Sequence, residues 1–171
     1  MKRLLLPAIV FMFFILESTV FQVLLTKNDE TIMVPRILFL ILLFIALDGP
    51  KNAAVVYAIS FGFLYDFLYT DVIGVYAFSF TVIVYLFKQV SNYLHIQFFL
   101  MTLFSIISIV LLEFLVFTIY SMIGITTISM LAFYEKLLLP SIIFNSIVLI
   151  LFYILLKKMV IKISLFSTEE S

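Results

Sequence analysis

Long apolar runs separated by short polar connections dominate the sequence. A helix needs about 20 mostly apolar residues to cross a hydrocarbon core of about 30 Å. Six segments come close to this requirement and are predicted to be transmembrane helices: residues 4–25, 32–47, 53–69, 72–87, 96–120 and 137–156. The runs are apolar on every helical face, whereas a membrane β-barrel would alternate apolar and polar side chains in strands of about 10 residues. We therefore predict an all-α integral membrane protein, with residues 1–171 forming one polytopic domain.

Polar connections set the boundaries of the predicted helices. Residues 27–30 separate the first two helices, and Asp-Gly-Pro-Lys-Asn at 48–52 is a strong turn signal before the third. Pro-Arg at 35–36 interrupts the second helix. Only Thr-Asp at 70–71 separates the third and fourth helices, which therefore form a tight hairpin or include a half-length helix. The stretch 121–136 is long for a loop yet apolar, so it either lies in the membrane interface or extends the fifth helix.

The composition supports a membrane protein and leaves few residues for catalysis. The chain is 65% hydrophobic and 12% charged, with a mean hydropathy of +1.32, whereas soluble domains are about 45–50% apolar and about 25% charged. Its 10 basic and 10 acidic residues cancel, so no nucleic-acid partner is expected. Cysteine is absent and His95 is the single histidine, which excludes thiolate metal sites and leaves one imidazole as a general base. We expect no enzyme activity, no cofactor and no metal.

The distribution of lysine and arginine predicts the orientation in the membrane. With the N-terminus in the cytoplasm, seven basic residues fall on the cytoplasmic side: Lys2, Arg3, Lys51, Lys88, Lys157, Lys158 and Lys162. Three fall on the opposite side, namely Lys27, Arg36 and Lys136. The positive-inside rule therefore places both termini in the cytoplasm. No Ala-x-Ala cleavage pattern follows the first apolar run, which we interpret as a retained helix.

Five polar residues lie inside the predicted helices: Glu17, Arg36, Asp66, Glu113 and Asn145. A charge near the bilayer centre costs at least about 2.5–3.5 kcal/mol, so each needs a reason. At about 1.5 Å per residue, all five fall in the outer half of the membrane. Arg36 is the only cation at that depth, and three carboxylates compete for it. The cluster is interpreted as a polar lock for helix packing, a lumen-facing pocket or a partner-docking site, and loss of the Arg36 charge should be more harmful than loss of the charge at exposed Lys27.

Several short motifs resemble one known family. Gly62-Phe63-Leu64-Tyr65-Asp66, followed by Tyr69-Thr70 and Gly74, is similar to a pattern of the rod shape-determining MreD family, in which Gly-x-x-x-Asp ends one helix and a glycine opens the next. Met1-Lys2-Arg3 through Leu16-Glu17-Ser18, and Leu112-Glu113-Phe114, resemble the family's first and fifth helices. The last helix, from Lys136 through Pro140 to Asn145, resembles the family's ending. The resemblance covers essentially the whole chain, although residues 121–135 carry no matching pattern.

This resemblance implies a small subunit of the bacterial cell-elongation machinery in the cytoplasmic membrane. Such proteins pair with MreC, a single-span membrane protein, and help to position peptidoglycan synthases. The resemblance also implies a helical fold similar to the substrate-binding subunits of energy-coupling-factor transporters, so a vitamin-binding transporter subunit is the alternative to a non-enzymatic scaffold. Those subunits commonly carry Ala-x-x-x-Ala on the first helix, whereas here Ala8 is followed four residues later by Met12, which favours the scaffold. Whether the protein forms homo-oligomers is left open.

Overall fold

The computed structural model describes residues 5–21, 33–94 and 97–168, and these residues form helices without any strand. In chain order the elements are α1 (Leu5–Leu16), the π-helical turn η2 (Glu17–Phe21), α3 (Ile37–Asp48), α4 (Lys51–Tyr69), α5 (Val75–Val90), α6 (Phe98–Met122), α7 (Met130–Phe133), the π-helical turn η3 (Tyr134–Leu138) and α8 (Leu139–Thr168). The prediction of an all-α protein is confirmed.

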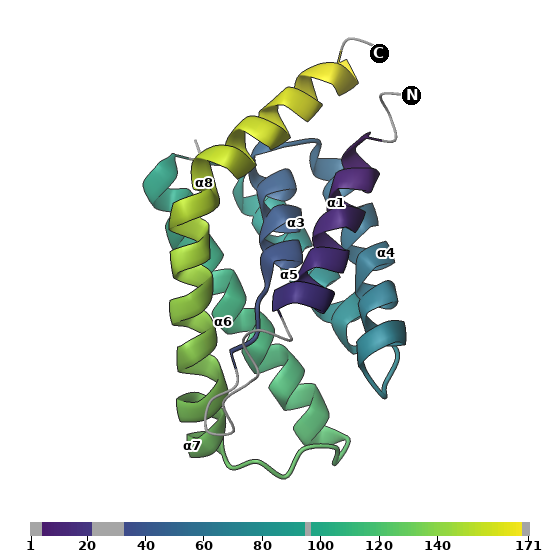
Figure 1. Cartoon of the computed structure of the whole chain (residues 1–171), viewed down its shortest axis with the longest axis vertical. Coiled ribbons are helices and arrows are strands. Elements are labelled where there is room, and N and C mark those ends of the chain that lie inside the picture. Colours follow the sequence, from purple (N-terminus) through teal and green to yellow (C-terminus); the bar gives the residue numbers. More distant parts are fainter. Residues whose placement is uncertain (1–4, 22–32, 95–96, 169–171) are drawn as a thin grey trace.

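Helix α3 lies at the centre of the bundle and is enclosed by the other helices (Figure 1). It contacts α1, α4, α5, α6 and α8, and every residue from Ile37 to Leu47 is buried. A helix that is hydrophobic on all faces is stable when it is covered on all sides. The sequence of α3, Ile-Leu-Phe-Leu-Ile-Leu-Leu-Phe-Ile-Ala-Leu-Asp, therefore explains its central position.

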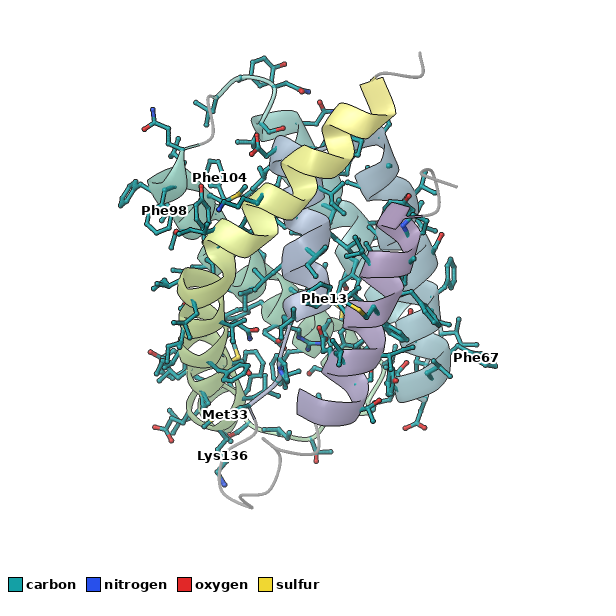
Figure 2. The ribbon with its side chains drawn as sticks, turned by 45° about the horizontal axis from the view of Figure 1, so that its top comes forward. Phe13, Met33, Phe67, Phe98, Phe104 and Lys136 are labelled. Carbon is teal, nitrogen blue, oxygen red and sulfur yellow. The ribbon has the colours of Figure 1, made fainter. Side chains whose placement is uncertain are left out.

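Large apolar side chains also cover the outside of the bundle. Phe67 is 73% exposed and Phe99 is 74% exposed, and Figure 2 shows Phe67 and Phe98 pointing away from the helices. Soluble monomers rarely expose large contiguous apolar patches, whereas a lipid-facing surface consists of such side chains. Three described helical stretches are long and apolar enough to cross a membrane, Asn52–Tyr69, Phe98–Met122 and Met130–Leu151, and three shorter apolar helices accompany them.

Helix α3 begins later than the second predicted helix, which was expected at 32–47. Residues 33–36 are not helical, and α3 starts at Ile37. Proline has no amide hydrogen and disfavours the α conformation in the residue before it. Pro35 therefore prevents α3 from extending back through Val34 and Met33. With 12 residues, α3 is about 18 Å long. Irregular backbone at membrane depth is tolerated only where protein covers it, and the central position of α3 provides this cover.

The last helix begins earlier and ends later than the predicted 137–156. It starts at Met130 and continues through η3 and α8 to Thr168. Of the stretch 121–136, the first two residues extend α6, residues 123–129 connect the helices, and the remainder belongs to the last helix. Pro140 is the second residue of α8 and lacks the amide hydrogen that would bond to the carbonyl four residues earlier. The π-helical turn η3 lies immediately before α8, where this backbone hydrogen bond is missing.

The remaining boundaries lie near the predicted ones. α4, α5 and α6 begin and end within three residues of the expected bounds. Residues 70–74 join α4 to α5 as a tight hairpin rather than as a half-length helix. The start of α1 and the end of α8 lie at the same end of the molecule (Figure 1). Residues 22–25 of the first predicted helix, Lys27 and His95 lie outside the described residues.

Candidate functional site

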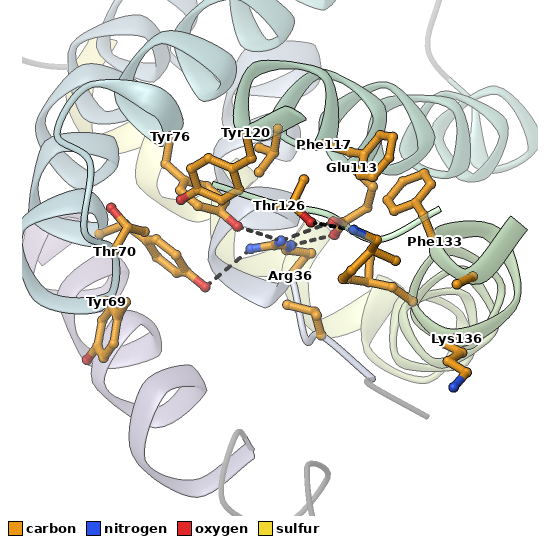
Figure 3. A pocket seen from close by; sticks show the side chains of 16 residues that line it. Arg36, Tyr69, Thr70, Tyr76, Glu113, Phe117, Tyr120, Thr126, Phe133 and Lys136 are labelled. Atoms are coloured by element: carbon orange, nitrogen blue, oxygen red, sulfur yellow. Dashed lines mark hydrogen bonds and ion pairs between the residues drawn. The ribbon is translucent and has the colours of Figure 1, made fainter. Parts of the chain in front are cut away.

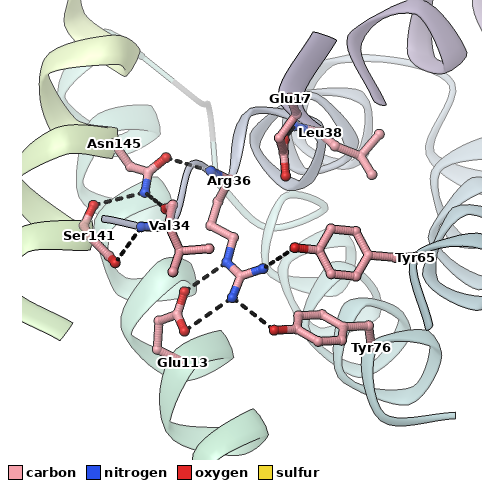
Figure 4. Close-up of polar contacts among 9 residues, drawn as sticks. All are labelled: Glu17, Val34, Arg36, Leu38, Tyr65, Tyr76, Glu113, Ser141 and Asn145. Atoms are coloured by element: carbon pink, nitrogen blue, oxygen red, sulfur yellow. Dashed lines mark hydrogen bonds and ion pairs between the residues drawn. The ribbon is translucent and has the colours of Figure 1, made fainter. Parts of the chain in front are cut away.

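Arg36 lies at the start of α3 and is the centre of a buried polar cluster. Its Nε donates to Oε1 of Glu113 at 2.7 Å, and its Nη2 donates to Oε2 of the same carboxylate at 3.2 Å. Nη1 donates to the hydroxyl of Tyr65 at 3.2 Å, and Nη2 donates to that of Tyr76 at 3.0 Å (Figure 4). The guanidinium carbon also lies 5.0 Å from the centroid of the Tyr76 ring. A paired carboxylate and two phenol oxygens thus satisfy a cation that would be costly to bury alone.

Glu17 serves the N-terminus of α3 rather than the guanidinium. Its Oε2 accepts a hydrogen bond from the amide of Leu38 at 2.6 Å, and the carboxylate is buried. The first amides of a helix have no partner within the helix, and the positive end of the helix dipole attracts a carboxylate. The turn η2, which begins at Glu17, therefore ties the first helix to the central one.

Asn145 and Ser141 of α8 bind the extended segment before α3. Asn145 Oδ1 accepts from the amide of Arg36, and its Nδ2 donates to the carbonyl of Val34, both at 2.8 Å. Ser141 Oγ accepts from the amide of Val34 at 3.1 Å. Residues four apart lie on the same face of a helix, so both side chains reach one segment. They supply the hydrogen bonds that a continuous helix would otherwise have provided.

Asp66 caps α5 from the end of α4. Its Oδ1 accepts from the amide of Tyr76 at 2.8 Å, while its Oδ2 accepts from the amides of Gly74 at 3.0 Å and Ala77 at 2.9 Å. Gly74 has a φ of 107°, a conformation that favours glycine. A Cβ on Gly62 would lie 2.5 Å from Cα of Ala77, so only glycine permits this approach of α4 and α5. The Gly-x-x-x-Asp pattern and the glycine that follows it therefore hold α4 and α5 together as a hairpin.

The structure brings the five predicted polar residues into the bundle interior, but it assigns them different partners. All five are buried: Glu17, Arg36, Asp66, Glu113 and Asn145. Of the three carboxylates that were expected to compete for the arginine, the one from α6 forms the ion pair with it. The other two cap helix N-termini, where backbone amides take the place of a cation as partners. These amides are free because α3 and α5 begin where they do. A count of charged residues along the sequence does not show where a helix begins.

Sequence reasoning missed Tyr65, Tyr76 and Ser141 as members of the cluster. Tyr65 lies within the quoted Gly-x-x-x-Asp motif, one residue before its aspartate. Ser141 precedes Asn145 by four residues, which places both on one helical face. Tyr76 lies in the first turn of α5, and its burial is set by the packing of α4 against α5. The spacing of Ser141 and Asn145 could therefore have predicted the serine. The two tyrosines could not be predicted, because nothing in the sequence distinguishes a tyrosine that binds a buried guanidinium from one at the membrane interface.

A cavity of about 620 Å³ adjoins the ion pair (Figure 3). Tyr65, Tyr69, Thr70 and Tyr76 of the α4–α5 hairpin line one side of it. The rest of the lining includes the rings of Phe117 and Phe133, which stack with centroids 4.2 Å apart, and the polar side chains of Tyr120, Thr126 and Lys136. Among the described residues, no three histidine, aspartate or glutamate side chains come together as metal ligands. The site can therefore hold buried charge and bind an organic molecule by shape and hydrogen bonds.

Comparisons with known proteins agree on one family. The family model described as rod shape-determining protein MreD matches residues 2–163. The chain is also 34% identical over 168 residues to the rod shape-determining protein MreD of Bacillus subtilis (strain 168), an alignment that covers 92% of this chain and 97% of that protein. No solved structure matches the chain.

Proposed function

This chain belongs to the MreD family of rod shape-determining proteins, and on that premise we propose that it is a non-enzymatic membrane scaffold of the bacterial cell-elongation machinery. In this function it supports lateral peptidoglycan synthesis. Family membership makes it a cell-shape-determining membrane protein, and it favours this function over that of a vitamin-binding transporter subunit. The fold similarity to energy-coupling-factor subunits is part of the same proposal.

The observation that carries the proposal is the use of the buried polar groups. The guanidinium of Arg36 makes hydrogen bonds to side chains of α4, α5 and α6, and its backbone amide bonds to α8. A charged group with this many partners is fixed in place and has little freedom for proton transfer or nucleophilic chemistry. The cluster joins five helices at one point, which is the property that a scaffold needs.

The proposed topology has six membrane crossings with both termini in the cytoplasm. The start of α1 and the end of α8 lie at one end of the bundle (Figure 1), as an even number of crossings requires. Lys88 is in the last turn of α5 and exposed Lys158 is in the C-terminal half of α8, whose end lies beside the start of α1 (Figure 1). Lys136 lies at the opposite end of the bundle (Figure 2). An excess of lysine supports a cytoplasmic assignment of the first end.

The proposed partners are an MreC-like single-span protein, the peptidoglycan synthases of the elongation complex and the lipid bilayer. Exposed apolar side chains such as Phe67 and Leu151 provide a surface on which either lipid or a partner's transmembrane helix can pack. A rigid bundle would present this surface in one geometry. Two copies of this chain could also associate through this surface, and the crosslinking experiment below tests for such a dimer.

The test is crosslinking in the native host, followed by purification of the tagged protein in mild detergent and mass spectrometry. We expect recovery of an MreC-like protein together with wall synthases. Recovery of a transporter coupling subunit with its ATPases, in the absence of those proteins, would overturn the proposal. A crosslinked species of twice the monomer mass would reveal a homodimer.

A matched pair of variants tests the importance of the cluster. Arg36→Met removes the central cation, and Lys158→Gln removes an exposed one. In a strain that lacks the native gene, we expect Arg36→Met to lower the recovery of partners and the fraction of rod-shaped cells. Lys158→Gln should give the same recovery and the same cell shape as the original protein. Equal partner recovery for the two variants at equal membrane levels would contradict the proposed role of the cluster.

A further inference from the structure

The cavity next to the Arg36–Glu113 ion pair has two chemically different sides. The α4–α5 hairpin contributes hydroxyl groups, and Tyr120 of α6 adds another, whereas the rest of α6 and α7 contributes an apolar wall of Val116, Phe117 and Phe133. Its volume of about 620 Å³ falls within the usual range for ligand sites, about 300–1,000 Å³. One water molecule takes about 30 Å³, so a cavity filled with water alone would hold many molecules. Those next to the apolar wall would have no hydrogen-bond partner there. The shape favours an occupant with one polar part and one apolar part.

The polar side is arranged to donate hydrogen bonds. The hydroxyl oxygens of Tyr65 and Tyr76 both accept from Arg36, so each hydroxyl hydrogen remains to be donated. Within the described part of the chain, both hydroxyls act as acceptors, and neither donates to another protein atom. Both side chains are buried, and a buried donor without an acceptor is unfavourable. An occupant with acceptor oxygens would satisfy both.

The charges that line the cavity favour an anion. Arg36 and Lys136 are positive, and Glu113 is the one carboxylate among the lining residues. Both oxygens of Glu113 accept from Arg36, so this carboxylate is already engaged. Lys136 is exposed at the edge and lies on the same side as the apolar wall. One positive charge is therefore left for an occupant.

We propose that this cavity binds an anionic lipid, whose oxygen-rich phosphodiester accepts from the tyrosine hydroxyls and whose apolar chain lies against Phe117 and Phe133, while Lys136 at the edge supplies the positive charge that favours an anion. A lipid fits better than a soluble anion because half of the wall is apolar and because the outer surface of the bundle faces lipid. The inference does not depend on the partnership with MreC.

The first experiment compares three probes on protein freed of lipid in the neutral detergent dodecyl maltoside. The probes are short-chain phosphatidylglycerol, short-chain phosphatidylcholine and inorganic phosphate, and the readouts are native mass spectrometry and the thermal unfolding midpoint. We expect one tightly bound phosphatidylglycerol and a raised midpoint, because a ligand that binds only the folded state stabilises it. Equal effects of inorganic phosphate would overturn the lipid assignment, and equal binding of the zwitterionic lipid would overturn the requirement for negative charge.

The second experiment distinguishes the cavity from the general lipid-facing surface. Ala132→Phe fills the cavity from α7 and should abolish the bound lipid. Lys136→Gln should weaken binding about fivefold, the effect of one basic residue near an anionic lipid, while the matched control Lys158→Gln should leave it unchanged. Equal affinity in both lysine variants would overturn the proposal, and this comparison holds even if Ala132→Phe does not fold.

Discussion

Arg36 and Glu113 lie 77 residues apart in the sequence and form a bidentate ion pair in the interior of the bundle, with Nε and Oε1 2.7 Å apart. The pair joins the start of α3 to the middle of α6. The two side chains are 2% and 3% exposed, so water screens them little and neither charge is satisfied by solvent. The contact therefore couples the stability of the central helix to that of α6.

The first prediction concerns this coupling. Glu113→Gln or Arg36→Met alone should lower the free energy of unfolding by about 3–5 kcal/mol, because each leaves an uncompensated buried group. The double variant Arg36→Met/Glu113→Gln should lose less than the sum of the single losses. Unfolding by SDS titration in mild detergent measures all four proteins. Additive losses would show that the two residues act independently.

The second prediction separates the role of Glu17 from that of Glu113. The carbonyl oxygen of glutamine can still accept from the amide of Leu38, so Glu17→Gln should change stability little. Glu17→Leu should cost about 1–3 kcal/mol, the effect of a buried donor without a partner. The same unfolding measurement applies. A loss for Glu17→Gln as large as that for Glu113→Gln would mean that Glu17 acts mainly as a counter-charge for Arg36.

The third prediction concerns the cap of α5. Asp66→Asn puts one NH₂ group against a backbone amide in either orientation of the side chain, since both carboxylate oxygens accept from amides. We expect a loss of about 2 kcal/mol, at the upper end of the range for helix caps. Asp71→Asn, an exposed aspartate in the same hairpin, is the matched control and should differ little from the original protein. Similar unfolding midpoints for both variants would remove the cap as an explanation of the motif.

The fourth prediction concerns the close approach of α4 and α5. Gly62→Ala should destabilise the protein by about 3 kcal/mol, at the upper end for overpacking, because the new Cβ would meet backbone atoms of Ala77. Backbone atoms cannot rotate away as a flexible side chain can. Ser60→Ala on the exposed face of the same helix should stay within about 0.5 kcal/mol. A neutral Gly62→Ala with unchanged helix contacts would contradict the assigned role of this glycine.

Much of the fold could be predicted from the sequence because lipid imposes a simple requirement. Apolar runs must be helical, since helices satisfy their own backbone hydrogen bonds in the absence of water. This requirement places α4, α5 and α6 close to their expected bounds and identifies the five buried polar residues as unusual. The function, to the level of the family, came instead from the resemblance of the Gly62–Asp66 and Gly74 motif, and the family comparison confirms it.

The partners of those polar residues were decided only by the tertiary structure. Whether Glu17 meets a guanidinium or a helix N-terminus depends on where α3 begins, and that depends on Pro35 together with the helices that cover the extended segment. The tyrosines and the cavity arise where the α4–α5 hairpin meets α6 and α7, elements that are distant along the chain. The apolar pattern determines that a segment is buried, because hydrophobic burial has no direction, whereas hydrogen bonds and ion pairs depend on distance and angle and so are fixed only when the helices pack.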